Sequence, residues 1–230
     1  MSKNQFQTVI SKINDLSVYV IDKAFSKKSY VSLDLSKDNA ELEFVNVSSA
    51  NNLGVYINEH IKVNNAQLAY GGYLETRGIY QRSSYFNQKT APLDERNIHL
   101  GVDLWINAGT NVLAALDSEV HSFSNNINHG DYGPTIILKH QVDDFVFYTL
   151  YGHLSTESLE SISIGDKYKK GEIIAQLGSS EVNGDYPPHL HFQIIIDIEN
   201  YMGDYPGVCS LNKLEFYKKN CPDPNLLLCL

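Results

Sequence analysis

The chain has 230 residues, of which 43% are hydrophobic and 20% charged, and its formal net charge is -9. This composition is that of an ordinary globular protein with a sizeable core, and it excludes a disordered chain. The longest basic runs are pairs such as Lys169-Lys170. The sequence therefore argues against nucleic acid or an anionic membrane as a partner.

Targeting signals are equally sparse. No apolar stretch is long enough to span a membrane. The longest apolar run among the first 25 residues, residues 18–21, is shorter than the core of a secretory signal. The three cysteines, Cys209, Cys221 and Cys229, are too few and too irregular for a disulfide framework. We expect a cytoplasmic protein with reduced thiols.

The first third of the chain predicts a small α+β portion, residues 1–71. Apolar residues at spacings of three and four over residues 4–25 predict an amphipathic helix. Residues 30–35 and 41–47 alternate between apolar and polar side chains, which predicts two strands. Residues 51–68 are expected to be a second helix or a helical turn and loop, before the Gly71-Gly72 break.

Residues 72–196 predict a mainly β domain. Short apolar runs alternate there with Gly, Asp and Asn turns, at residues 112–116, 135–139, 145–151, 172–177 and 191–196. Many short strands with little helix predict an antiparallel β-sheet or a barrel-like sandwich. Residues 197–230 contain three prolines and a Leu226-Leu227-Leu228 run. We expect them to form an irregular C-terminal wrap that docks apolar groups on the domain.

Candidate chemistry begins at His189 and His191, at the entrance to an apolar run. Because side chains alternate along a strand, both imidazoles face one cleft while Leu190 points into the opposite layer. A single His-X-His pair in a β-rich protein is more often an ordinary surface pair. Two other segments strengthen the prediction of a site. One has a histidine and a carboxylate four residues apart, in His99-Leu100-Gly101-Val102-Asp103. The other adds a further histidine, in Tyr151-Gly152-His153-Leu154.

These motifs resemble, in order and spacing, those of the lysostaphin-type zinc metallopeptidases. The resemblance covers roughly residues 72–196 and includes the turns Gly109-Thr110 and Gly165-Asp166. It implies a compact antiparallel β core with its site in an open groove. It further implies that zinc (Zn2+) is bound by His99, Asp103 and His191, with His153 and His189 as the catalytic imidazoles. The implied substrate is a peptide or a peptidoglycan-derived stem or cross-bridge, often cleaved at glycine or D-amino acid positions.

The residue types support these implied roles. Two imidazoles and one carboxylate are sufficient for catalytic zinc, which leaves its remaining position to water. The sequence has no His-Glu-X-X-His motif to supply a glutamate base. His153 and His189 are natural substitutes because imidazole titrates near neutral pH. One would activate water and the other would steady the oxyanion, in either order. Gly101 and Gly152 are either close-approach positions or simple turn glycines.

Two other functions remain open. Two histidines and a carboxylate also form the facial triad of non-haem iron oxygenases, although the two additional imidazoles argue against this. A non-catalytic, zinc-stabilised peptide-binding or regulatory module would have no need of both His153 and His189. Residues 1–71 could also cover the groove and keep the enzyme latent.

Other polar groups near these motifs are expected to be less direct. His60, His121, His129 and His140 are predicted to be surface or core groups. Tyr132, Tyr151 and Tyr186 could line a groove, although packing is the favoured explanation in a chain with 15 tyrosines. The turn at residues 183–188 is bulkier and more acidic than is usual in the family. We expect this turn to alter substrate choice.

Overall fold

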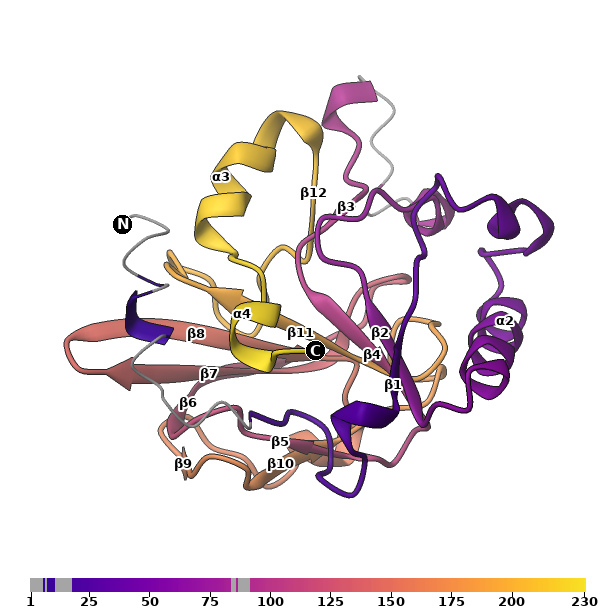
Figure 1. The fold of residues 1–230 in the computed structure, drawn as a ribbon. Coiled ribbons are helices and arrows are strands. Elements are labelled where there is room, and N and C mark those ends of the chain that lie inside the picture. The colour runs from indigo at the N-terminus through magenta and orange to yellow at the C-terminus, as the bar shows by residue number, and fades with distance from the viewer. Residues whose placement is uncertain (1–5, 7, 11–17, 84–85, 87–91) are drawn as a thin grey trace.

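A computed structural model describes residues 6, 8–10, 18–83, 86 and 92–230. Its main feature is an eight-stranded sheet in the order β1-β2-β4-β11-β8-β7-β6-β9. Its strands are β1 Tyr30–Ser32, β2 Leu68–Gly71, β4 Val102–Trp105, β6 Ser118–Asn126, β7 Gly133–Val142, β8 Phe145–Gly152, β9 Lys167–Tyr168 and β11 His189–Ile195. Every pair is antiparallel except β1 with β2. The sheet is open, with β1 and β9 at its ends, so the described strands do not close into a barrel (Figure 1).

Two small antiparallel sheets accompany the main one. They pair β5 Asn111–Leu113 with β10 Ile173–Gln176, and β3 Ile98–His99 with β12 Val208–Cys209. The helices are α2 Ala50–Val63, α3 Leu214–Asn220 and α4 Asn225–Leu228, and Figure 1 shows α2 at the β1–β2 edge of the sheet. Short 3-10 helices connect these elements, at Lys27–Ser29, Ala40–Phe44, Ile79–Arg82, Pro92–Asp94, Thr156–Leu159 and Leu211–Lys213. The fold is mainly β, as the sequence predicts.

The central strand β11 is buried at all seven positions. It separates the apolar core on one face from the polar site on the other. Its even-numbered residues Leu190, Phe192 and Ile194 belong to the largest apolar cluster. Its odd-numbered residues begin with His189 and His191, which line a cavity on the other face. The period of two along a strand therefore separates the core from the site, as predicted.

Both ends of the described chain pack on the same core. The apolar cluster beneath β11 also contains Phe6, Val18 and Ile21 from the N-terminal side and Leu227 and Leu228 from the C-terminal side. Ile21 pairs with Val112 as an isolated bridge. These segments cover apolar surface that the sheet alone would leave in water.

Several N-terminal predictions need correction. A helix is expected over residues 4–25, and residues 6 and 8–10 are helical. Residues 18–25 are not helical, because Ile21 is extended and pairs with Val112 of β5. The rest of the expected helix lies outside the described residues. The strand expected over 41–47 is wrong. Residues Ala40–Phe44 form a 3-10 helix, since the Asn39 side chain accepts a hydrogen bond from the backbone N–H of Glu41 and starts a helical turn.

Other predicted elements are confirmed. The helix expected over 51–68 is α2, capped by the Ser49 hydroxyl, while Leu68 already begins β2. The strands expected after residue 110 correspond to β5, β7, β8, β10 and β11. The Asp143-Asp144 turn joins β7 to β8, with φ of +53° at Asp143, as tight hairpins require. The expectation of an irregular tail over residues 197–230 is not confirmed, because the tail contains β12, α3 and α4.

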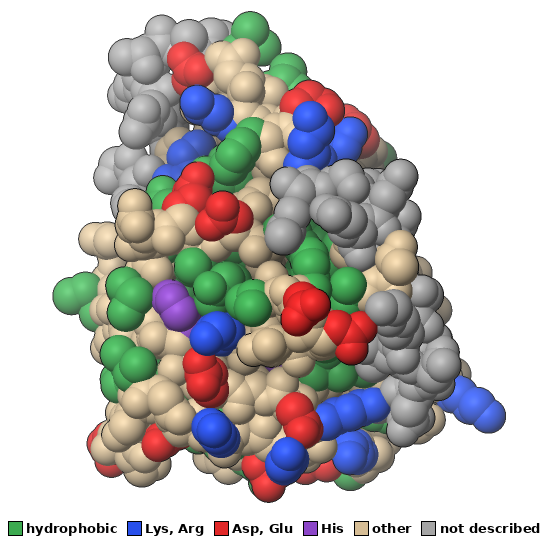
Figure 2. All heavy atoms as spheres, turned by 90° about the vertical axis from the view of Figure 1, so that its left-hand side faces the viewer, with side chains coloured by type: hydrophobic (Ala, Val, Ile, Leu, Met, Phe, Trp, Pro, Cys, Tyr) green, Lys and Arg blue, Asp and Glu red, His purple; other side chains and the backbone are tan. Residues whose placement is uncertain are grey.

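Charged side chains of both signs are interspersed on the face shown in Figure 2. No helix among the described residues is long and apolar enough to cross a membrane.

Candidate active site

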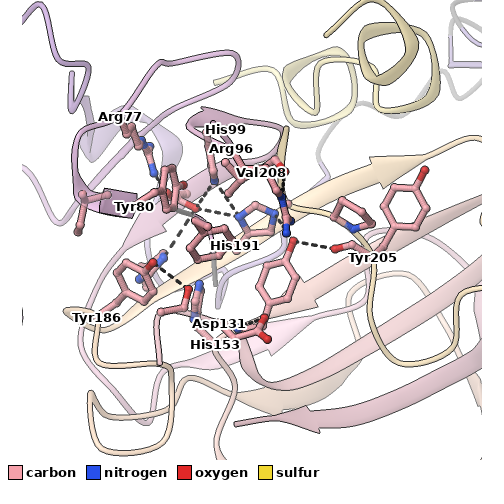
Figure 3. A pocket seen from close by; sticks show the side chains of 18 of the residues that line it. Arg77, Tyr80, Arg96, His99, Asp131, His153, Tyr186, His191, Tyr205 and Val208 are labelled. Atoms are coloured by element: carbon pink, nitrogen blue, oxygen red, sulfur yellow. Dashed lines mark hydrogen bonds and ion pairs between the residues drawn. The ribbon is translucent and has the colours of Figure 1, made fainter. Parts of the chain in front are cut away.

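Five polar side chains from three neighbouring strands and a small sheet converge in one cavity. His99 ends β3, Asp103 lies in β4, His189 and His191 lie in β11, and His153 directly follows β8. The register places His191 opposite Asp103 on one side of β11. Each of the five is at most 5% exposed, and all line the same cavity. Figure 3 labels His99, His153 and His191 among the residues that line it.

Three of these residues, which we call the triad, are His99, Asp103 and His191. The His99 Nε2 and His191 Nδ1 atoms lie 2.9 Å apart. Each lies 3.3 Å from Asp103 Oδ1. One donor atom from each residue fits within a span of 4.8 Å. This spacing brings two nitrogens and one oxygen close enough to surround a single metal ion.

Hydrogen bonds on the outer side fix which nitrogen faces the centre. His99 Nδ1 lies 2.9 Å from the carbonyl oxygen of Gly72, and His191 Nε2 lies 3.0 Å from Gln193 Oε1. Because a carbonyl oxygen only accepts, these outer nitrogens carry the protons. The inner nitrogens therefore present lone pairs to one another and to Asp103.

The surroundings of Asp103 Oδ1 indicate whether a cation fits between the three triad residues. The atom is buried and has no hydrogen-bond donor. A buried polar atom without a partner is costly and rare in a native protein. A cation between Oδ1 and the two lone pairs would satisfy all three atoms at once, so the donor set fits a bound metal.

The second carboxylate oxygen of Asp103 is already engaged. Arg77 Nη1 donates to Asp103 Oδ2 over 2.5 Å, and Arg77 Nε donates to Glu75 Oε2 over 2.8 Å. Burial would raise the pKa of Asp103, but the nearby His99 ring and the Arg77 guanidinium hold it well below its usual value. Since His99 is itself neutral near pH 7, Arg77 is the permanent charge that keeps Asp103 ionised.

The other two imidazoles, which we call the histidine pair, are His153 and His189. Their ring centroids lie 4.2 Å apart. The Nδ1 atoms donate to backbone carbonyl oxygens of Asn183 and Pro187, each over 2.8 Å. The Nε2 atoms are therefore the unprotonated ones, and His189 Nε2 lies 3.8 Å from Asp103 Oδ1. Both rings are placed to exchange protons with a group bound at the triad.

Burial keeps three of the site histidines, His99, His153 and His189, neutral. It lowers the pKa of His99 and of His189 to about 4. It also lowers the pKa of His153, with further lowering by the adjacent rings of His189 and His191. A neutral imidazole is the form that binds metal and accepts a proton. The site is therefore ready for both roles at neutral pH.

Two glycines make the close packing possible. A Cβ at Gly101 would lie 2.6 Å from the His191 ring, and one at Gly152 would lie 2.6 Å from the Tyr132 ring. Of the two explanations offered by the sequence, close approach is the one that the structure supports.

Several residues that line the cavity or contact its side chains were not identified from the sequence. Trp105 stacks on the His189 ring at 3.9 Å between centroids, and Gln193 fixes the His191 tautomer. Arg77 contacts Asp103 across 26 residues of sequence. Their only available signal was position: Trp105 and Gln193 each lie two residues from a predicted ligand, on the same face of its strand. Arg77 offered none beyond its place in the segment after Gly72.

The other tyrosines and histidines considered from the sequence differ in whether they line the cavity. Tyr132 and Tyr186 line the cavity, whereas Tyr151 lies in the core with its hydroxyl accepting from the Ala115 backbone N–H. His140 is buried in β7 and bonded to Thr149. None of the four remaining histidines, His60, His121, His129 and His140, lines this cavity.

Comparisons with known proteins identify relatives of this domain. The model of peptidase family M23 matches residues 97–202. The catalytic domain of the antimicrobial peptidase lysostaphin from Staphylococcus simulans is 25% identical, with a TM-score of 0.38, covering 69% of this chain and 96% of that one. Longer lysostaphin is 29% identical, with a TM-score of 0.35 and coverage of 52% and 44%. A zinc-containing peptidase from Vibrio cholerae is 26% identical, with a TM-score of 0.35 and coverage of 48% and 34%.

This chain thus spans less than half the length of the longer lysostaphin. Among curated proteins, no similar sequence was found. The segment that matches the family model contains the complete triad and the histidine pair. Over residues 97–202, the segment that holds the site, the chain is thus similar to the metallopeptidases of family M23.

Proposed function

We propose that this protein is a zinc-dependent endopeptidase. It hydrolyses peptide bonds in peptidoglycan stems or cross-bridges, or in glycine-containing peptides. The observation that supports this most directly is Asp103 Oδ1, a buried atom without a hydrogen-bond donor that faces the unprotonated nitrogens of His99 and His191. The family match supports the class of reaction, the hydrolysis of peptide bonds.

In this proposal the triad holds Zn2+ through His99 Nε2, Asp103 Oδ1 and His191 Nδ1. Zinc bound there would polarise the scissile carbonyl and lower the pKa of a water molecule from about 15.7 to about 7. Two nitrogens and one carboxylate oxygen are a donor set typical of catalytic zinc.

The histidine pair then handles protons. Both rings have their Nδ1 protons tied to backbone carbonyls, so each Nε2 can accept a proton from the attacking water. A ring that has accepted a proton can donate it from Nε2 to the leaving amine. Its neighbour supports the negatively charged oxygen when its own Nε2 is also protonated, which the developing negative charge favours. Either ring can fill either role, and general acid–base assistance of this kind contributes about 10² to 10⁴-fold.

The N-terminal portion contributes a wall of the cavity. Leu35, which follows β1, lines it. That residues 1–71 restrain access to the groove stays a prediction. Replacing Leu35 with Ala tests it, because a restraining wall predicts a lower KM for long peptides, whereas an unchanged or higher KM contradicts it.

Digestion of defined substrates tests the proposed function. Zinc-loaded protein is incubated with purified muropeptides and with glycine-rich peptides, and the products are identified by mass spectrometry. We expect cleavage that a chelator stops and added zinc restores. Absence of cleavage with zinc bound would favour the non-catalytic module. Iron in protein purified without added metal, together with oxygen consumption, would favour an oxygenase.

A further inference from the structure

Asp103 differs from the two histidines in what holds its outer atom. His99 and His191 are steadied by neutral acceptors, whereas Asp103 Oδ2 is held by the Arg77 guanidinium at 2.5 Å. Arg77 is only 5% exposed. It lies between β2 and the Ile79–Arg82 turn, outside the segment matched by the family model. The contact is thus a buried ion pair directed at a single oxygen.

Several contacts prevent the guanidinium from moving away. The Arg77 backbone N–H donates to the Asn97 carbonyl over 2.8 Å, and its Nε donates to Glu75. Gly72, at φ of +109°, makes room for the side chain, since a Cβ there would collide with Arg77 Nη2. The arginine is therefore a fixed partner rather than a surface side chain that samples many rotamers.

This arrangement restricts how Asp103 can bind a metal. A free carboxylate can coordinate through one oxygen or through both, and a second oxygen raises the coordination number. Oδ2 is occupied by Arg77, and only Oδ1 faces the lone pairs of His99 and His191. Small tetrahedral ions such as zinc suit a single oxygen, whereas larger oxygen-seeking ions gain from both.

We propose that Arg77 is a positioning residue that confines Asp103 to one-oxygen coordination. It thereby keeps the coordination number low and disfavours larger divalent ions. The inference rests on the proposed metal site, because it describes how the triad would hold its ion. In this proposal Arg77 acts on the metal through Asp103, with which its guanidinium pairs.

Cobalt substitution tests this directly, without any activity measurement. Co2+ with four ligands absorbs visible light strongly, and added ligands weaken this absorption. We expect intense bands in the wild type and a severalfold loss in Arg77→Met, which frees Oδ2. The ratio of Mn2+ affinity to Zn2+ affinity should also rise about tenfold or more in Arg77→Met. Arg82→Met is the matched control, since Arg82 is another arginine with a buried side chain but contacts the 184–185 segment instead of Asp103.

The outcomes separate this inference from the proposed function. Wild-type protein that gives no cobalt spectrum would reject the metal site itself. A strong wild-type spectrum that is unchanged in Arg77→Met would reject only the role of Arg77. If Arg77→Met does not fold, Arg77→Lys decides, because a lysine lacks the fixed two-pronged geometry. A partial loss of intensity in that variant supports the proposal, and a wild-type spectrum overturns it.

Discussion

The triad and the histidine pair are adjacent but are held by different parts of the protein. The triad lies on paired strands, and two of its three outer atoms are bound by the side chains of Arg77 and Gln193. The histidine pair is oriented by two carbonyls, those of Asn183 and Pro187, within one short loop before β11. The geometry of the triad therefore depends on the sheet, whereas the geometry of the histidine pair depends on a loop. The two should therefore be separable by substitution.

The largest effect should come from breaking the triad. In Asp103→Ala we expect peptide cleavage and bound zinc to fall to background, because one donor is gone. Arg77 is then left as a buried charge without this partner, which should cost about 3–5 kcal/mol of unfolding free energy. Metal analysis and urea unfolding measure the two losses. Unimpaired cleavage in this variant would remove the proposed site.

Substitutions in the histidine pair should leave zinc in place. We expect kcat to fall by about 10² to 10⁴-fold in His189→Ala and in His153→Asn. Asparagine is chosen for position 153 because the backbone there has φ of +64°, which asparagine tolerates better than alanine. Steady-state kinetics and zinc content are measured together. Loss of zinc comparable with that of Asp103→Ala would mean that the two halves are not separable.

Loosening the loop should have a smaller effect than removing an imidazole. Arg82 Nη2 donates to the Asp185 carbonyl over 2.7 Å, and its guanidinium lies 4.3 Å from the centre of the Tyr186 ring. Arg82→Met should lower kcat by about tenfold through misplacement of the pair. Zinc affinity should stay at the wild-type value.

Asp185→Asn is the control for this loop substitution. It removes the exposed charge at 3.2 Å but keeps the carbonyl contact. An exposed pair of this kind is worth about 1 kcal/mol or less, so kinetics should be close to wild type. A larger effect of Asp185→Asn than of Arg82→Met would contradict the assignment of the carbonyl as the anchor.

A buried histidine outside the cavity gives the smallest effect on activity and tests pH dependence. Burial lowers the pKa of His140 to about 4, whereas an unfolded histidine titrates near 6.5. Between these values the unfolded chain binds more protons, so stability falls as pH falls from 6.5 toward 4. His140→Gln should reduce this loss by about 3 kcal/mol at most, with kcat at pH 7 unchanged. Urea unfolding of metal-free protein at pH 7 and pH 4.5 measures it, and equal losses in both proteins would contradict the assignment.

The sequence predicted the strands well because their signal is local. Alternation and apolar runs mark β7, β8 and β11, and each side chain's face follows from its place in the strand. His189 and His191 could be placed on one face for the same reason. The resemblance of separated motifs then grouped them with His99, Asp103 and His153, and the structure brings all five to one cavity.

The incorrect sequence predictions arise where the deciding contact is not part of the local pattern of apolar residues. Residues 40–44 alternate as a strand would, but the Asn39 cap makes them helical, so a local hydrogen bond prevailed over the pattern. Ile21 is extended because β5 offers it a partner, which no helical periodicity reveals. Arg77 was missed because a contact across 26 residues leaves no trace in one sequence.

The pairing of His191 with Asp103 on one side and with Gly152 on the other carries a consequence for folding. A slip of β11 by one residue would turn Leu190 and Phe192 toward the proposed metal site and bury both imidazoles in the apolar core. An ion could therefore be captured only by molecules whose strands had aligned correctly. The rate of zinc uptake during refolding would then report the rate at which β11 aligns, without the need for a substrate.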